Sequence, residues 1–543
     1  MDTGFKKAYD FGKFVDIEKI PNCTQTDETD TFVMTIPRHL HNEKICREAK
    51  QKELESWDYF DVYTEVPDNG QPRIGTNWVL TEKVIDRKLG IKSRLTVRGD
   101  QEDKSNIRKD SPTVRKGNVK IFCAVAAKEG WKIKSIDAKC AFLQGAIMER
   151  DVFILPPLER RVPGILWKLK KPVYGLTDAA RGWHLALTES VTEAGCEKCF
   201  VDPAMFLNFS NTNNDQRKIQ GIVLSHVDDL LHGGSNTFEH EVMNNVKSSF
   251  KFSEEESEEF RYIGMNMIQS NSGIFLNQDH YIHSIELPNM DIAKDLKCDD
   301  ILSIDGQTEF RGCVAKILYV GFQSRPDVCF EGKRLSTKFG KATKKDLKCA
   351  FKMIKKLKGE NTHMFFPNLG EVSEWSIVGY SDAGVRCMPD KLTSVGGQVV
   401  LIVNEEKHIA CVLNWRSKKL QRKVISSLAG EALAMVVMIG EIVYNKAILT
   451  QIFGDIIKTL PVVLFTDCKN LHDAIYSSSL VEDSWLIPDI AMIQEALEQR
   501  TMTCVRRVTS EDMLADCLTK AGASAEKLMH VLQTGQYDFP SHQ

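Results

Sequence analysis

The sequence predicts a mixed α/β, multidomain fold, and three observations support this prediction. The chain has 543 residues, a length typical of about three to four domains. Hydrophobic residues make up 42% and charged residues 27% of the chain, as in ordinary globular proteins, which excludes a mainly disordered chain. Strand-like apolar runs alternate with stretches of helical spacing over most of the length.

Net charge and cysteine usage narrow the class of protein. The 71 Lys and Arg and 74 Asp and Glu give a net charge of −3, so any nucleic-acid surface has to come from local segregation of charge. The N-terminus lacks the apolar core of a signal peptide, and no stretch approaches the ~18 unbroken apolar residues of a membrane span. The 15 Cys include one close pair, Cys196 and Cys199, which is weak evidence for zinc. Free thiols in a reducing compartment are the better interpretation, so we expect an intracellular protein without a membrane partner.

The N-terminal part is predicted to combine a lead-in, a helix and a hairpin. Residues 1–42 show little periodicity and are expected to be poorly ordered, whereas 43–57 have helical spacing. Two strand-like segments around a Lys88–Gly90 turn predict a β-hairpin with basic residues on one strand. This hairpin opens a basic region, residues 83–120, with 12 Lys and Arg against 5 Asp and Glu.

A second basic region and an α/β block follow. Residues 331–360 hold 11 Lys and Arg against 3 Asp and Glu, and Thr343 is the predicted N-cap of an amphipathic helix there. Its lysine face is either solvated or follows a phosphate backbone. From Trp375 onward the predicted order is strand, strand, a long helix from Ser426 or Ser427, strand and helix, which indicates a mixed α/β domain of roughly 150 residues.

Three acids indicate a first metal site. Asp228 and Asp229 lie inside an apolar, hairpin-like segment, and Asp137 ends another strand-like segment. Desolvated carboxylates need a cationic partner, and two metal ions about 4 Å apart can stabilise the attacking and leaving oxygens of nucleotidyl transfer. Taken alone, the Asp-Asp pair is more simply a turn with solvated acids. The metal interpretation depends on Asp137 joining it.

Four further acids stand alone in apolar sequence of the C-terminal block. Asp382 and Asp467 each end a strand, Glu431 lies on the long helix, and Asp516 lies on a late helix. Each alone suits a cap or turn acid. Together, at strand, helix, strand and helix, they indicate a second carboxylate site for divalent cations.

These residues stand in segments that resemble, in order, the reverse transcriptase and ribonuclease H region of copia-type LTR retrotransposon Pol polyproteins. The segments are ELESW with VPDNGQPRIGTNWV, KSRLTVRGD, SIDAKCAFLQGAIMERDVFILPP, VYGLTDAARGW, HVDD, FRYIGMNM and QSRPDVCF. The C-terminal block adds SDA, EA, TD and ADCLTK. The resemblance covers roughly residues 45–530. It implies a right-hand polymerase with fingers, palm and thumb, followed by a ribonuclease H-like α/β domain.

The resemblance also implies domain boundaries and an activity. The implied boundaries are a lead-in at 1–42, reverse transcriptase fingers and palm at 43–270, thumb or connection at 271–370, a ribonuclease H-like domain at 371–525 and a tail at 526–543. The implied activity is RNA-directed DNA polymerisation with cleavage of the RNA in RNA–DNA hybrids. Each site would use two Mg²⁺, with Mn²⁺ as a substitute, and the partners would be an RNA template, a DNA primer, RNA–DNA hybrid and deoxynucleotide triphosphates.

Carried over position by position, the resemblance assigns roles to the residues. The polymerase metal ligands are Asp137, Asp228 and Asp229, and the ribonuclease H ligands are Asp382, Glu431, Asp467 and Asp516. The expected substrate contacts are Lys92, Arg94 and Arg98 for the triphosphate, Phe142 as an aromatic gate against a ribose 2′-OH, Asp178 near the nucleotide, and Tyr262 in a turn near the primer. Taken alone, Lys92, Arg94 and Arg98 are also explained as the solvent-exposed face of a basic strand.

Two positions depart from the family pattern. His226 replaces the usual Tyr before V-D-D, and Asp178 replaces a Gln, which would place a negative charge near phosphate. These changes support an alternative, a decayed or domesticated element whose product binds nucleic acid without catalysis, although seven retained acids argue against it. A two-metal nuclease without polymerase function would leave Phe142 unexplained. We expect a fragment of a Pol-type polyprotein or an independent gene product, either cytoplasmic in particles or nuclear.

Overall fold

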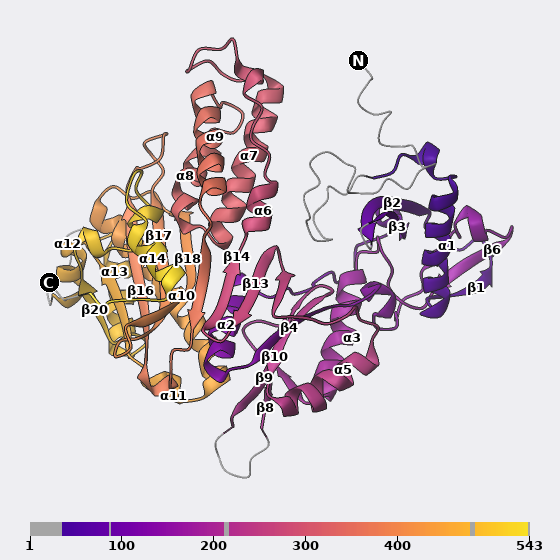
Figure 1. Ribbon diagram of the computed structural model, residues 1–543, viewed down its shortest axis with the longest axis horizontal. Coiled ribbons are helices and arrows are strands. Elements are labelled where there is room, and N and C mark those ends of the chain that lie inside the picture. Colours follow the sequence, from indigo (N-terminus) through magenta and orange to yellow (C-terminus); the bar gives the residue numbers. More distant parts are fainter. Residues whose placement is uncertain (1–34, 86–87, 211–216, 478–483, 541–543) are drawn as a thin grey trace. The chain divides into compact units, whose positions relative to one another are not determined.

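The computed structural model describes residues 35–85, 88–210, 217–477 and 484–540 (Figure 1). The chain forms two compact units, and it passes between them several times. Unit 1 comprises residues 1–112, 137–195 and 244–253, and unit 2 comprises residues 113–136, 196–243 and 254–543. Neither unit is therefore one continuous segment of sequence.

Unit 1 contains a three-stranded sheet, a long hairpin and helices. The sheet has the order β1 (Tyr63–Pro67), β6 (Ile165–Leu169), β5 (Phe153–Ile154), and the hairpin pairs β2 (Thr76–Ile85) with β3 (Lys88–Val97). The helices are α1 (Lys44–Tyr59), α3 (Ala179–Glu193) and α5 (Asn244–Ser249). The predicted helix over 43–57 is confirmed as α1, whose Trp57 is buried against Trp167.

The hairpin is confirmed, but its predicted turn is wrong. Lys88 and Gly90 belong to β3, where they pair with Ile85 and Lys83. The glycine suggested a turn, yet a glycine is tolerated inside a strand. The connection instead falls at residues 86–87, which lie outside the described residues.

The first part of unit 2 is a six-stranded sheet with one buried helix. The strand order is β11 (Glu256–Ser257), β4 (Lys132–Asp137), β10 (Asp229–Gly234), β9 (Ile219–His226), β8 (Met205–Phe209), β7 (Cys196–Lys198). Helix α2 (Lys116–Glu129) precedes β4, and its stretch from Asn118 to Ala126 is buried. After β10 come a short α4 (Asn236–Phe238) and a π-helical turn, η7 (Glu239–Met243).

A four-stranded antiparallel sheet and a helical insertion follow. The sheet has the order β12 (Glu259–Tyr262), β13 (Met265–Ser270), β14 (Gly273–Asn277), β15 (His363–Pro367). Between β14 and β15 lie α6 (Asp279–Ser284), α7 (Ile304–Gln323), α8 (Cys329–Ser336) and α9 (Lys344–Gly359), and Figure 1 shows α7, α8 and α9 packed side by side. The predicted cap of α9 is confirmed, because Thr343 and Asp346 form a capping box.

The predicted C-terminal α/β block is confirmed, although its five-stranded sheet holds two strands, at Ile409–Lys419 and Cys504–Arg507, that the predicted order lacks. The strand order is β18 (Ile409–Lys419), β17 (Val395–Asn404), β16 (Trp375–Gly384), β19 (Val462–Thr466), β20 (Cys504–Arg507). The first three strands are antiparallel, and β16, β19 and β20 are parallel. This sheet carries α10 (Ser427–Phe453), α11 (Ile456–Thr459), α12 (Lys469–Tyr476), α13 (Ile487–Glu498) and α14 (Glu526–Thr534).

Helix α10 begins where the sequence predicted, with Ser426 as its N-cap. Among the described residues it is the one helix long and apolar enough to cross a membrane by length and composition. It packs against β16 and β17, whose residues are buried along their whole length. Its apolar composition is therefore that of a helix covering a sheet in a protein core.

Candidate active sites

The first group of acids begins with a strained hairpin connection. Strand β9 ends at His226 and β10 begins at Asp229, and these two residues pair directly. Val227, between them, has φ +60°, a region that a β-branched residue adopts only when the surrounding structure imposes it. Buried apolar residues on both strands anchor the hairpin. The consequence is that Asp228 stands exposed at the tip with Asp229 beside it.

Asp137 reaches this hairpin along the neighbouring strand. It is the last residue of β4, which lies beside β10 in the six-stranded sheet. The boundary between the two units falls directly before Asp137, so the other residues of β4 belong to unit 2. One carboxylate oxygen from each of Asp137, Asp228 and Asp229 lies within 4.8 Å of the others.

The three carboxylates suit hard divalent cations, which prefer oxygen ligands. His226, which replaces a Tyr in this motif, does not add a positive charge at neutral pH, because burial lowers the pKa of its half-buried imidazole although Asp228 opposes the effect. The His226 ring therefore does not balance the negative charge of the three carboxylates.

The predicted fingers residues lie on one strand face in unit 1. Lys92 and Arg94 alternate along β3, so their side chains share a face. The Arg94 guanidinium lies 5.8 Å from the centre of the Tyr174 ring, and the Phe142 ring lies 5.1 Å from the same ring. Arg98, just beyond β3, pairs with the exposed Asp100 at 2.7 Å. Tyr174 was missed by sequence reasoning, although it stands in the VYGL segment that carries the resemblance.

Arg150 pairs with Asp178, the residue whose negative charge was expected near phosphate. Its two carboxylate oxygens each accept a hydrogen bond of 2.9 Å from the Arg150 guanidinium. Arg150 also donates to the buried Glu102 at 2.6 Å, and Glu102 accepts a hydrogen bond from the backbone N–H of Thr177. No local pattern predicts this contact, because the residues are distant along the chain.

Tyr262 is placed differently from the other predicted contact residues, because its ring is buried with only 2% exposed. The turn after it, Ile263–Gly264, adopts positive φ at both residues (50° and 71°), and the Tyr319 hydroxyl donates to the Ile263 carbonyl at 3.5 Å. The ring therefore packs in the core, and the accessible part of this segment is the Gly264 backbone. Contact with a primer stays a prediction.

The second group of acids collects at one edge of the C-terminal sheet. Strands β16 and β19 are parallel neighbours, so Asp382 near the end of β16 and Asp467 directly after β19 lie at the same edge. Asp516 joins them, and one oxygen of each lies within 4.8 Å of the others. The prediction of a helix at Asp516 is wrong: the residue opens a short 3₁₀ turn, η12 (Asp516–Leu518). Just after this turn, the Thr519 hydroxyl donates to Asp382.

Glu431 completes this group from α10. Its Oε1 accepts a hydrogen bond of 3.2 Å from the Ala383 N–H, and its buried Oε2 has no hydrogen-bond partner among the described residues. Burial, and then the charges of Asp382 and Asp467, raise the pKa of Glu431 to about 9. Burial likewise raises the pKa of Asp516 to about 6. Ionising several buried acids side by side is costly, and a divalent cation would balance their charge. The residues present therefore fit a divalent cation.

Lys520 lies among these carboxylates. Its Nζ is 2.7 Å from Asp516 Oδ1, 3.2 Å from Asp382 Oδ1 and 3.6 Å from Asp467 Oδ2. The three acids raise the pKa of Lys520, although burial opposes the shift. The lysine was visible in the sequence only as part of the ADCLTK motif, and its role as a counter-charge follows from the structure.

Comparison with known proteins finds a family match for the segment that carries the first group of acids. Residues 58–297 match the reverse transcriptase (RNA-dependent DNA polymerase) family. This part of the chain is similar to reverse transcriptase domains. This segment includes Asp137, Asp228 and Asp229, together with all six predicted substrate-contact residues.

Relatives extend the similarity beyond the reverse transcriptase domain. The chain is 27% identical over 470 residues to the retrovirus-related Pol polyprotein from transposon RE1 of Arabidopsis thaliana, and 25% identical over 472 residues to that from transposon RE2 of the same plant. Each match covers 82% of this chain but only 30% and 31% of the relative. The resemblance to copia-type Pol polyproteins is thereby confirmed, and the chain spans under a third of these relatives.

A solved structure shows the same fold. It is a foamy viral protease–reverse transcriptase in complex with double-stranded DNA, with a TM-score of 0.50, 10% identity, and coverage of 90% of this chain and 74% of that chain. At this identity the likeness concerns the fold alone. It confirms the predicted mixed α/β class with a right-hand polymerase.

Proposed function

We propose that this chain is an RNA-directed DNA polymerase of a copia-type retrotransposon whose C-terminal domain cleaves the RNA strand of RNA–DNA hybrids. The observation that carries the proposal is the meeting of Asp137 with the Asp228–Asp229 hairpin on neighbouring strands. The reverse transcriptase match over residues 58–297 supports the same activity.

In the polymerase site the three carboxylates would hold two Mg²⁺, with Mn²⁺ as a substitute. Bound metal would supply positive charge for the attacking and leaving oxygens. The chain's own contribution is orientation, because the paired His226–Asp229 connection fixes where the carboxylates stand. Lys92, Arg94 and Arg98 would bind the triphosphate, and Phe142, braced by Tyr174, would exclude a ribose 2′-OH.

In the C-terminal site Asp382, Glu431, Asp467 and Asp516 would hold the metal ions. The unpaired Glu431 Oε2 supports this assignment. The substrate would be an RNA–DNA hybrid, recognised by its shape and its 2′-hydroxyls. We also propose an RNA template, a DNA primer and deoxynucleotide triphosphates as partners, and residence inside the cell. Four exposed lysines of α9 repeat with helical spacing on one face and suit a phosphate backbone: Lys345, Lys348, Lys352 and Lys355.

Primer extension on an RNA template with Mg²⁺ tests the polymerase. Asp228→Asn and Asp229→Asn each should lower the rate by at least ~10²-fold, because a ligand for catalytic charge is lost. The matched control is Asp299→Asn, an exposed acid outside both groups, which should extend like wild type. Wild type that binds template and primer but incorporates no deoxynucleotide would favour the alternative, a binding-only product.

Cleavage of a labelled RNA–DNA hybrid tests the second site separately. Glu431→Gln should abolish cleavage and leave extension intact, whereas Asp228→Asn should do the reverse. Glu498→Gln, an exposed acid on α13, is the control with the same chemical change. Loss of both activities from one substitution would contradict two independent centres.

A further inference from the structure

A buried carboxylate beside the six-stranded sheet is used by neither proposed reaction. Asp202 lies in the turn between β7 and β8 and is only 3% exposed. Its Oδ2 accepts hydrogen bonds from the Arg115 N–H at 3.0 Å and from the Asn118 side chain at 2.5 Å, and its Oδ1 accepts one from the Ala204 N–H at 3.1 Å. A buried carboxylate is stable only when it is hydrogen-bonded, so Asp202 holds the start of α2 against this turn.

The same group of side chains reaches the C-terminal domain through α10. Asn118 also donates to the Tyr444 hydroxyl at 2.8 Å, and the Arg115 guanidinium lies 4.4 Å from the centre of the Tyr444 ring. Further along α10, the Gln451 side chain accepts a hydrogen bond of 3.2 Å from the Phe200 N–H. Helix positions seven apart share one face, so one face of α10 lies on the turn between β7 and β8.

Backbone hydrogen bonds continue from this turn to the hairpin of β9 and β10. The Ala204 carbonyl accepts a hydrogen bond of 2.8 Å from the Ser225 N–H, and the Ser225 carbonyl accepts one of 3.0 Å from the Val114 N–H, just before α2. Ser225 directly precedes His226, the last residue of β9. The hydrogen bonds that begin at α10 therefore extend to the residue before the hairpin connection.

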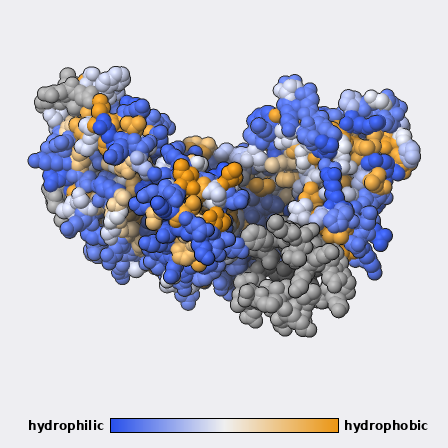
Figure 2. All heavy atoms as spheres, turned by 90° about the horizontal axis from the view of Figure 1, so that it is seen from above, coloured by the Kyte–Doolittle hydropathy of each residue, from blue (hydrophilic) through white to orange (hydrophobic). Residues whose placement is uncertain are grey.

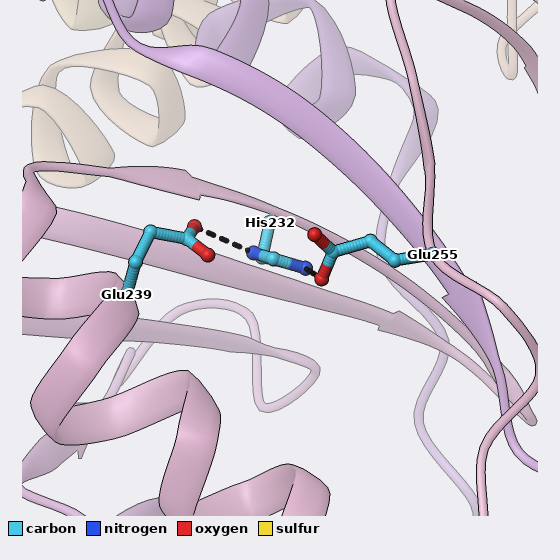
Figure 3. A group of neighbouring side chains, drawn as sticks. All are labelled: His232, Glu239 and Glu255. Carbon is cyan, nitrogen blue, oxygen red and sulfur yellow. Dashed lines mark hydrogen bonds and ion pairs between the residues drawn. The ribbon is translucent and has the colours of Figure 1, made fainter.

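The other strand of this hairpin is held by contacts within the six-stranded sheet and the segments beside it. On β10, His232 lies between Glu239 and Glu255 (Figure 3), and its Nδ1 lies 3.1 Å from Glu239 Oε1. The Lys134 ammonium on β4 lies 2.8 Å from an oxygen of each carboxylate. The hydrogen-bonded link to α10 therefore runs through β9 rather than β10.

Helix α10 connects the same link to the second group of acids, because it also carries Glu431. At a rise of 1.5 Å per residue, Glu431 and Tyr444 lie about 20 Å apart along the helix axis. All the residues of the link, together with Asp228 and Asp229, belong to unit 2. Tyr444 therefore joins the helix that carries a C-terminal acid to the segment that ends at the Asp228–Asp229 hairpin.

We propose that Tyr444 is a positioning residue that holds the Asp228–Asp229 hairpin and the acids around Glu431 at one fixed separation. On a primed template, the C-terminal site would then cut the RNA at one preferred distance behind the primer end. This inference rests on the proposed function, because it requires both sites to act on the same hybrid. Replacing Tyr444 should change where the RNA is cut and leave the rate of each reaction nearly unchanged.

Cleavage of an RNA–DNA hybrid with a recessed primer end tests this role, with the lengths of the labelled RNA products measured on a gel. Tyr444→Ala removes the hydroxyl and the ring, and the share of product at the main cleavage position should fall by at least about twofold. Tyr444→Phe keeps the ring beside Arg115 and should give a smaller fall. If Tyr444→Ala fails to fold, Tyr444→Phe provides the test.

The matched control is Tyr476→Ala, the same change on α12. The Tyr476 hydroxyl bonds to the backbone of Val505 inside the C-terminal domain, so this variant removes a tyrosine without touching the link to the hairpin. Its cleavage position should match that of wild type. A wild-type cleavage pattern in the Tyr444 variants overturns the positioning role.

Hydrogen exchange keeps the inference distinct from the proposed function, because it needs neither reaction. The Ser225 amide is bonded to Ala204, and Tyr444→Ala should speed amide exchange in peptides that span β9 by about fivefold, whereas Tyr476→Ala should not. Equal exchange in wild type and Tyr444→Ala overturns the link. Faster exchange in Tyr444→Ala, together with a wild type that cuts no RNA, would contradict the proposed function and leave the link supported.

Discussion

Single residues of the C-terminal centre show how burial sets the charge of a carboxylate. Glu431 is buried beside Asp382 and Asp467, and its pKa is raised to about 9 from an ordinary value of 4.5. Lys520 balances part of the remaining charge from 2.7 to 3.6 Å. Burial beside two acids therefore favours the protonated form of Glu431, and Lys520 supplies a positive charge to the same group of side chains.

This protonation predicts a pH-dependent stability at Glu431. Between pH 4.5 and about 9 the folded protein holds a proton on this group that the unfolded chain releases, so its contribution to stability falls as pH rises. In EDTA, Glu431→Gln should melt at a higher temperature than wild type, and the gap should widen from pH 5 to pH 9. A gap that does not change with pH, measured by differential scanning fluorimetry, would contradict the raised pKa.

At the scale of secondary-structure elements, an ion pair links the connection before α3 to two other segments. Arg150 holds Asp178 and Glu102 together in unit 1. If the nucleotide binds as proposed, this pairing keeps the charge of Asp178 from repelling the triphosphate. The substitution of Gln by Asp in the family motif is then tolerated because an arginine compensates for it.

Arg150→Met should therefore raise the KM for deoxynucleotides by about tenfold or more, because a carboxylate is left unpaired near phosphate. The double variant Arg150→Met with Asp178→Gln should recover most of the loss. Steady-state primer extension measures both, and Arg161→Met, which removes an arginine bonded only to the Pro156 carbonyl, is the control. Failure of the double variant to recover would show that Arg150 acts in another way.

Local sequence patterns predicted some of these elements, whereas contacts between distant segments could not be predicted. The Asp228–Asp229 hairpin and the capped start of α9 were predictable, because alternation, glycines and a capping box are local signals. The pairing of Arg150 with Asp178 joins segments far apart in sequence, and no local pattern encodes it. Tyr262 was predicted as a contact residue from its motif, but burial of its ring depends on tertiary packing.

At the scale of the whole molecule, unit 2 joins the six-stranded sheet to the C-terminal sheet in one hydrophobic core. Helix α2 forms the joint: Asn118 donates to the Tyr444 hydroxyl at 2.8 Å, and the Lys120 ammonium lies 3.3 Å from the centre of the Trp415 ring. Figure 2 shows one face of the molecular surface, which is mostly hydrophilic with hydrophobic residues in small groups. The apolar surface of α2 is therefore covered by the C-terminal domain itself.

Ending the chain after residue 370 should uncover α2 and destabilise the six-stranded sheet. We expect the truncated protein to unfold at lower urea than the full chain and to bind a hydrophobic dye, because the side chains around Trp415 no longer cover the helix. Lys120→Met in the truncated chain serves as a comparison, since it changes the same surface without further removal of the core. Unchanged urea resistance would show that the two sheets fold independently.

We propose that Asp137, Asp228 and Asp229 form one catalytic centre, and single-turnover primer extension on an RNA template is the decisive test. We predict that Asp137→Asn, Asp228→Asn and the double variant all lose activity to the same extent, since groups that act as a unit are not additive, while Asp299→Asn extends normally. Full extension by Asp137→Asn, with loss confined to Asp228→Asn, would contradict the shared centre.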